Sequence, residues 1–132
     1  MEQIDHVELF VPDRHEAARW CERVFGLKIM SDFEDWATQG GPLMVSSGNG
    51  TKLALFEGEP QGENESVGFR RVAFRTGGEG FIEFLDRLAK LDVRSRATDH
   101  DKAYSVYFSD PYGNDFEVTT YDHGCVSERL DG

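Results

Sequence analysis

Apolar and polar residues alternate along several short segments of the chain, and two longer segments carry apolar residues every three or four positions. Strict alternation predicts a half-buried strand, whereas the wider spacing predicts an amphipathic helix. The first half begins with a predicted strand over residues 4–11 and a helix over 13–25 that ends at Gly26. A polar loop is predicted over residues 31–42. Short strands are predicted over residues 27–30, 43–47 and 52–56.

The second half of the chain repeats this order. A strand over residues 69–76 leads into a helix that reaches Lys90, with Thr76 and Glu79 placed as a capping box at its start. Three short strands, separated by polar loops, are predicted over residues 93–96, 104–108 and 115–121. The last two are joined by a turn of Asp, Pro, Gly and Asn over residues 110–114.

Two copies of one module therefore account for the chain. They span residues 1–57 and 68–121, with an acidic, glycine-rich linker over 58–67 and a polar tail over 122–132 that is mobile or serves as an interface arm. The pattern predicts a single α+β domain of two tandem βαβββ modules. Each module is expected to carry one helix on the convex face of a curved mixed sheet, and the two sheets to form a cleft.

The strand positions that face away from the predicted helices carry charges beside aromatic rings. They are His6, Glu8, Phe10, Lys52, Ala54, Phe56, Arg71, Arg75, Tyr107, Asp115 and Glu117. A sheet face with so many charges is a poor core, because a buried charge is costly without a partner. We therefore interpret this face as the wall of the cleft. Phe33 and Trp36, in the polar loop, either cover a pocket or pack back on the core.

The composition of the chain limits the classes of molecule that it can bind. The formal net charge of -11 over 132 residues argues against nucleic acids and anionic membranes, since both require a basic surface. No apolar run approaches the roughly 20 residues that span a bilayer, and residues 1–5 lack the features of a secretory signal, so we expect a cytoplasmic protein. The acidity indicates either adaptation of a halophile to a salt-rich cytoplasm or an ordinary acidic protein, and both readings stay open.

Three motifs carry a family resemblance over roughly the first 121 residues. They are Ile4-Asp5-His6-Val7, Arg71-Val72-Ala73-Phe74, and the run from Phe108 through Asp-Pro-Tyr-Gly-Asn to Glu117. The chain resembles the vicinal oxygen chelate superfamily, which includes glyoxalase I, the fosfomycin and bleomycin resistance proteins and the extradiol dioxygenases. The resemblance implies paired βαβββ modules, a small-molecule ligand and a homodimer. It leaves open whether the cleft closes within one chain or across the dimer.

Metal-dependent members of that superfamily hold a divalent ion with histidine and glutamate side chains, and the matching positions here are His6, Ala54, Arg71 and Glu117. His6 and Glu117 can ligate zinc, nickel, manganese or iron, and Glu8 is a further candidate. Alanine has no ligand atom, and arginine does not deprotonate to bind a cation. In the alternative that we favour no metal binds, and Arg71 supplies the positive charge in a bidentate pair with Glu117.

The resemblance implies an enzyme of lyase or isomerase type that acts on a small oxygenated substrate. Glu117 or Glu8 would be the general base and Tyr107 a hydrogen-bond donor. Arg71 and Arg75 would clamp an anionic substrate. The aromatic contacts would come from Phe10, Phe56 and Trp36. The alternative is a metal-free protein that sequesters an antibiotic, because an acidic cleft with aromatic rings favours cationic, aromatic ligands.

Overall fold

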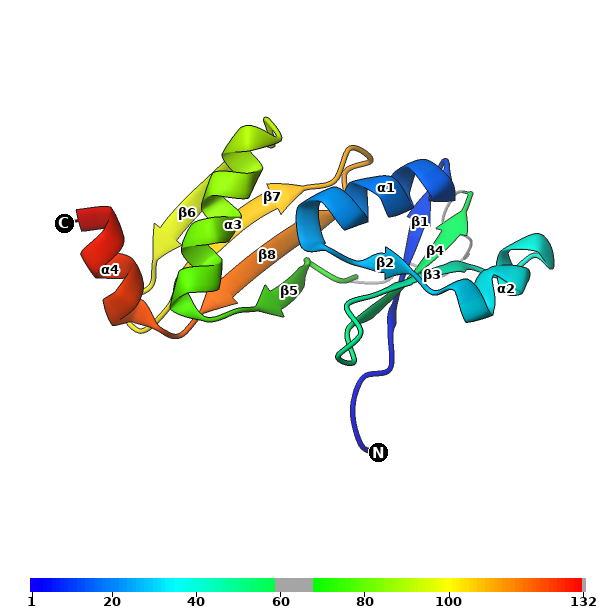
Figure 1. Cartoon of the computed structure of the whole chain (residues 1–132), viewed down its shortest axis with the longest axis horizontal. Helices are drawn as coiled ribbons and strands as arrows, with labels where there is room; N and C mark the ends of the chain where they lie inside the picture. The colour runs from blue at the N-terminus through cyan, green and yellow to red at the C-terminus, as the bar shows by residue number, and fades with distance from the viewer. Residues whose placement is uncertain (59–67, 132) are drawn as a thin grey trace. The chain divides into compact units, whose positions relative to one another are not determined.

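The computed structural model describes residues 1–58 and 68–131, and it divides into two compact units, Met1–Ser66 and Val67–Gly132 (Figure 1). The predicted linker over residues 58–67 lies, apart from Gly58, outside the described residues. In the described part of the chain, every helix is too short or too polar to cross a membrane.

Unit 1 is a four-stranded mixed sheet with a long helix, α1 (Arg14–Phe25), against strands β3 and β4. The sheet has the order β1-β4-β3-β2, in which β1 and β4 are parallel and the other neighbours antiparallel. Its strands are β1 (Val7–Val11), β2 (Lys28–Ile29), β3 (Leu43–Ser46) and β4 (Lys52–Glu57). A short 3-10 helix, η1 (Ser31–Phe33), and helix α2 (Glu34–Thr38) lie between β2 and β3.

Unit 2 repeats the topology. Its sheet has the order β5-β8-β7-β6, again with the first pair parallel and the others antiparallel. The elements are β5 (Val72–Arg75), α3 (Gly78–Lys90), β6 (Ser95–Asp99), β7 (Tyr104–Ser109), β8 (Asp115–Thr120) and α4 (His123–Asp131). Helix α3 lies across this sheet (Figure 1). The two mixed sheets confirm the predicted α+β fold and the internal βαβββ repeat.

The ends of the helices show which of the predicted capping residues form caps in the structure. The Asp13 carboxylate accepts hydrogen bonds from the backbone N–H groups of His15 (3.0 Å) and Glu16 (3.1 Å), and α1 ends at Gly26 with a φ of 74°. Both features were predicted. The cap predicted at Thr76 is wrong: Gly77 is the N-cap of α3, without a side-chain hydrogen bond, and the backbone N–H of Thr76 donates to the carbonyl of Thr119 (3.0 Å).

The turn between β7 and β8 forms as predicted. One Asp110 oxygen accepts from the backbone N–H groups of Tyr112 (2.9 Å) and Asn114 (2.8 Å), and the other accepts from the Asn114 side chain (2.8 Å). Gly113 takes a φ of 94°, which a side chain would strain. This turn sets the register in which Tyr107 lies beside Glu117.

One predicted loop, one predicted strand and the predicted tail differ in the structure. The loop over residues 31–42 contains η1 and α2, and the sixth strand occupies Ser95–Asp99 instead of residues 93–96. The polar tail forms helix α4, which contacts α3 and buries Val126 completely. His123 at its start pairs with Asp99 of β6 at 2.7 Å. These segments have few apolar residues, so their order depends on contacts with distant parts of their units.

Candidate functional site

A pocket of about 260 Å³ opens on unit 1. Its walls come from the start of β1, from β3 and β4, and from the segment that holds η1 and α2. The lining residues are Asp5, His6, Glu8, Met30, Phe33, Trp36, Pro42, Met44, Lys52 and Phe56. One side of the pocket therefore carries charges and the other carries rings and thioethers, a composition typical of sites for small organic molecules.

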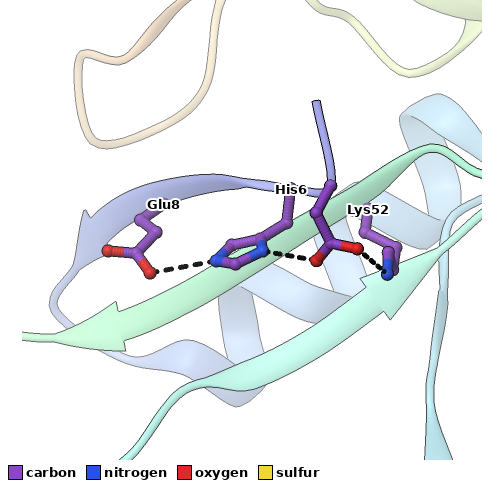
Figure 2. Close-up of polar contacts among 4 residues, drawn as sticks. His6, Glu8 and Lys52 are labelled. Atoms are coloured by element: carbon purple, nitrogen blue, oxygen red, sulfur yellow. Dashed lines mark hydrogen bonds and ion pairs between the residues drawn. The ribbon is translucent and has the colours of Figure 1, made fainter. Parts of the chain in front are cut away.

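The charged side is a continuous chain of polar contacts (Figure 2). The Lys52 ammonium donates to one oxygen of Asp5 (2.8 Å), and the other oxygen of Asp5 lies 2.8 Å from Nδ1 of His6. The Nε2 atom of His6 lies 3.0 Å from the Glu8 carboxylate. His6 immediately precedes β1 and Glu8 lies on it, and the two side chains meet two residues apart, as the sequence predicted. Asp5 lies one residue further from β1, beyond the alternation that turns neighbouring strand side chains apart.

Two carboxylates on one imidazole shift its protonation. The hydrogen bond to Asp5, and after it the hydrogen bond to Glu8, raises the pKa of His6 above its ordinary value of 6.5. The hydrogen bond from Lys52, followed by that from His6, lowers the pKa of Asp5. Both ring nitrogens can donate only when the ring is an imidazolium, so the protonated form satisfies both contacts.

We expect a proton NMR titration to place the midpoint of His6 above the ordinary value of 6.5. Because the folded-state pKa is raised, the stabilisation from charged His6 is complete below the unfolded value of about 6.5 and is lost as the pH rises through the folded value. Replacing Asp5 by Asn should lower the midpoint. A His6 midpoint at or below 6.5 would contradict the expected charge network.

The aromatic side of the pocket comes from the segment that was predicted as a loop. The rings of Phe33 and Trp36 lie 4.6 Å apart between centroids, and Trp36 remains 45% exposed. Phe56 of β4 joins them in the lining, while Phe10 contacts Phe56 at 6.3 Å and lies outside it. Phe33 and Trp36 thus line a pocket, which decides between the two roles that the sequence left open.

Arg14 holds this aromatic segment in place, and the sequence analysis missed it. Its guanidinium donates to the carbonyls of Ala37 (2.7 Å) and Gly41 (3.2 Å), and its Nε lies 3.7 Å from the Glu57 carboxylate. One local feature could have indicated this role of Arg14. A basic side chain in the first turn of a helix interacts unfavourably with the helix dipole, so its presence there suggests a contact elsewhere.

Replacing Arg14 by Ala should lower the free energy of unfolding by about 1–3 kcal/mol, because two carbonyls lose a charged donor. It should also change the fluorescence of Trp36, measured in a Trp20→Phe background so that Trp36 is the reporting tryptophan. Arg19→Ala, an exposed arginine of the same helix, is the control. Equal urea denaturation midpoints and spectra for the two variants would mean that Arg14 does not position the segment.

Unit 2 brings together three of the other predicted residues. Tyr107 and Glu117 are paired in the β7–β8 ladder, and the Arg71 guanidinium carbon lies 4.4 Å from the centre of the Tyr107 ring. Glu117 accepts a hydrogen bond from the Thr119 hydroxyl at 2.7 Å. Among the described residues no ion pair joins Arg71 to Glu117, so the predicted bidentate pair does not form there. Arg75 lies over Tyr121 instead, at 5.5 Å.

The residues at the family's metal positions do not fit a divalent ion. Both ring nitrogens of His6 are engaged by carboxylates, Ala54 is buried and has no donor atom, and Arg71 is a cation. Within either unit, the described residues contain no group of three His, Cys, Asp or Glu side chains placed to hold a metal. The convergence of His6, Arg71 and Glu117 in one cleft involves both units and stays a prediction.

The fold and these motifs define a protein class. The family model of the Glyoxalase/Bleomycin resistance protein/Dioxygenase superfamily matches residues 3–118, so the chain belongs to that superfamily, and the resemblance noted in the sequence is confirmed. Among characterised proteins, the chain is 28% identical over 135 residues to the metallothiol transferase FosB of Lysinibacillus sphaericus (strain C3-41), covering 99% of this chain and 89% of FosB.

Solved structures show the same fold. A glyoxalase/dioxygenase from Nostoc punctiforme superposes with a TM-score of 0.72 at 18% identity, over 91% of each chain. A mutant of the fosfomycin resistance protein FosX from Listeria monocytogenes, complexed with Mn(II) and 1S,2S-dihydroxypropylphosphonic acid, superposes with a TM-score of 0.72 at 19% identity. That alignment covers 100% of this chain and 99% of FosX.

Proposed function

We propose that the protein binds a small oxygenated molecule in the unit 1 pocket and transfers a proton on it without a metal, as an enzyme of isomerase or lyase type. The observation that carries this proposal is His6, held between Asp5 and Glu8 in the wall of an aromatic-lined pocket. Membership of a superfamily that contains small-molecule enzymes supports it.

Glu8 is the general base of the proposed reaction. One of its oxygens receives the hydrogen bond from His6, which orients the carboxylate, and the other oxygen accepts the proton from a carbon next to the substrate carbonyl. Negative charge then develops on the carbonyl oxygen. The ammonium of Lys52 lies in the pocket lining and stabilises this charge, because it has N–H donors besides the one given to Asp5. Return of the proton to the adjacent carbon gives an isomer, and loss of a leaving group gives a lyase product.

The aromatic side selects the substrate and excludes water. Phe33, Trp36 and Phe56 offer an apolar surface to a part of the ligand that carries no charge. A volume of about 260 Å³ suits a molecule of a few carbon atoms or one small ring. Excluding water from this side strengthens the electrostatic contacts on the opposite one.

The test is proton exchange in heavy water. Purified protein with EDTA is mixed with hydroxyacetone, dihydroxyacetone, pyruvate and lactate, and loss of the α-proton signals is followed by NMR. Catalysed exchange that EDTA does not reduce is the expected result. Exchange that appears only after manganese, nickel, zinc or iron is added would overturn the metal-independent mechanism. If the parent chain exchanged protons no faster than a His6→Gln variant with every one of these substrates, the proposal that the protein is an enzyme would be overturned.

A second candidate function rests on the juxtaposition of carboxylates with the Phe33–Trp36 pair. Rings beside acidic groups bind cationic aromatic ligands, which suits a protein that sequesters a drug without reaction. Titration with a cationic aromatic molecule of one ring, such as benzylammonium, followed by Trp36 fluorescence, measures that binding. Saturable binding without proton exchange would favour sequestration over catalysis.

A further inference from the structure

Two arginines of unit 2 converge on one tyrosine ring. The guanidinium carbon of Arg71 lies 4.4 Å from the centre of the Tyr107 ring, and that of Arg96 lies 5.1 Å from it. Arg71 directly precedes β5, whereas Arg96 is the cross-strand partner of Tyr107 on β6. The Tyr107 hydroxyl lies 2.8 Å from Nε2 of His100. The sequence analysis named Arg71 and Tyr107 but neither Arg96 nor His100.

Within the described residues these two cations have no carboxylate partner, although acidic residues outnumber basic ones in the chain. The protein carries 25 acidic side chains and 14 lysines and arginines, yet among the described residues neither Arg71 nor Arg96 forms an ion pair. The Nε–H of Arg71 is buried without an acceptor in the described part of the chain. The attraction of a cation to the face of a ring does not replace a charged acceptor for the guanidinium.

The nearest carboxylate in the register is engaged elsewhere. Glu117 is the partner of Tyr107 on β8, but its carboxylate accepts from the hydroxyl of Thr119 (2.7 Å), which in turn lies 2.9 Å from the hydroxyl of Ser105. The Thr119 hydroxyl holds Glu117, and in the described part of the chain neither guanidinium group forms an ion pair with it. A planar guanidinium offers paired donors that match the oxygens of a carboxylate or a phosphoryl group.

We propose that Arg71 and Arg96, beside Tyr107, bind an oxyanion of a small ligand directly and without a metal. Arg71 occupies one of the family's metal-ligand positions. A guanidinium cannot ligate a metal ion, but it can bind an anion at the same place. The ligand class is a small molecule that bears a carboxylate, phosphate or phosphonate group. This inference does not depend on the proton transfer proposed for unit 1.

The test follows the arginine Nε–Hε signals by NMR in the 15N-labelled full chain, with EDTA present and ionic strength held constant with chloride. Inorganic phosphate, methylphosphonate and acetate are titrated separately, which distinguishes tetrahedral from planar anions. We expect saturable shifts of the Arg71 and Arg96 signals with at least one probe. Arg71→Gln and Arg96→Gln should each weaken binding about tenfold or more, which is about 1.4 kcal/mol or more.

Arg94→Gln is the matched control, because it removes the same charge from an exposed arginine close to Arg96 in sequence. Arg71→Lys keeps the charge without the paired donors and should bind more weakly than the parent chain. Equal losses in Arg94→Gln and Arg96→Gln would assign the effect to net charge and overturn the site. Linear, unsaturable shifts with all three probes would overturn it as well. Loss of proton exchange with anion binding retained would refute the proposed function alone.

Discussion

The Glu8→Gln variant is expected to lose about 10²- to 10⁴-fold in the rate of proton exchange, the range that a positioned general base contributes. The amide keeps the size of the side chain, and its oxygen can still accept from Nε2 of His6, but it cannot take up the substrate proton. The measurement is the NMR exchange assay with EDTA, at saturating substrate, for both chains. Substrate binding, followed by Trp36 fluorescence, should change much less than the rate.

Glu22→Gln is the control, since this exposed carboxylate lies on α1 and outside the pocket lining. Its exchange rate should equal that of the parent chain. If Glu8→Gln exchanged as fast as Glu22→Gln, Glu8 would not be the base, and Glu117 would be the next candidate from the sequence. Circular dichroism of each variant separates a lost base from a lost fold.

Phe116→Ala is expected to lower the free energy of unfolding of the chain by about 3–5 kcal/mol, the range for truncating a buried phenylalanine. Phe116 is 1% exposed on β8, and its ring lies between Phe74 (6.2 Å, 24°) and Phe108 (6.0 Å, 22°). Removing the ring leaves a cavity between two stacked neighbours that are fixed on β5 and β7. Urea denaturation followed by far-ultraviolet circular dichroism measures the loss.

Phe69→Ala removes the same ring from a fully exposed position and should stay within about 0.5 kcal/mol of the parent chain. Phe116→Leu, which keeps part of the volume, should lie between the two. A loss in Phe116→Ala no larger than in Phe69→Ala would mean that the stack on the unit 2 sheet does not support the fold.

The parts of the fold that the sequence predicted correctly depend on neighbours in the chain. Helix α1 has a capping carboxylate at Asp13 and a left-handed stop at Gly26, and the β7–β8 turn has Asp110 and Gly113, all within a few residues of the groups they bind. Helices α2 and α4 were missed because their support is distant. Arg14 holds α2 from 23 residues away, and Asp99 pairs with His123 across 24 residues.

In the candidate site, too, the sequence predicted the residues that a local pattern places and missed the contacts that depend on the fold. The period of two along β1 and β4 placed His6, Glu8 and Phe56 on a common face, and all three line the unit 1 pocket. The role of Asp5 was missed, because it lies one residue before His6 and strand alternation would have turned it away. Arg71 was expected to pair with Glu117, and it lies on Tyr107 instead.

By itself, the sequence determined the two long helices, the order of the strands, the duplication and the faces on which charged side chains lie, because alternation, caps and turn chemistry act over a few residues. The tertiary structure decided which of those side chains touch. Lys52 reaches Asp5 across 47 residues, and Arg71 meets the ring of Tyr107 across an intervening strand, because strand order and side-chain rotamers set distances that no local pattern encodes.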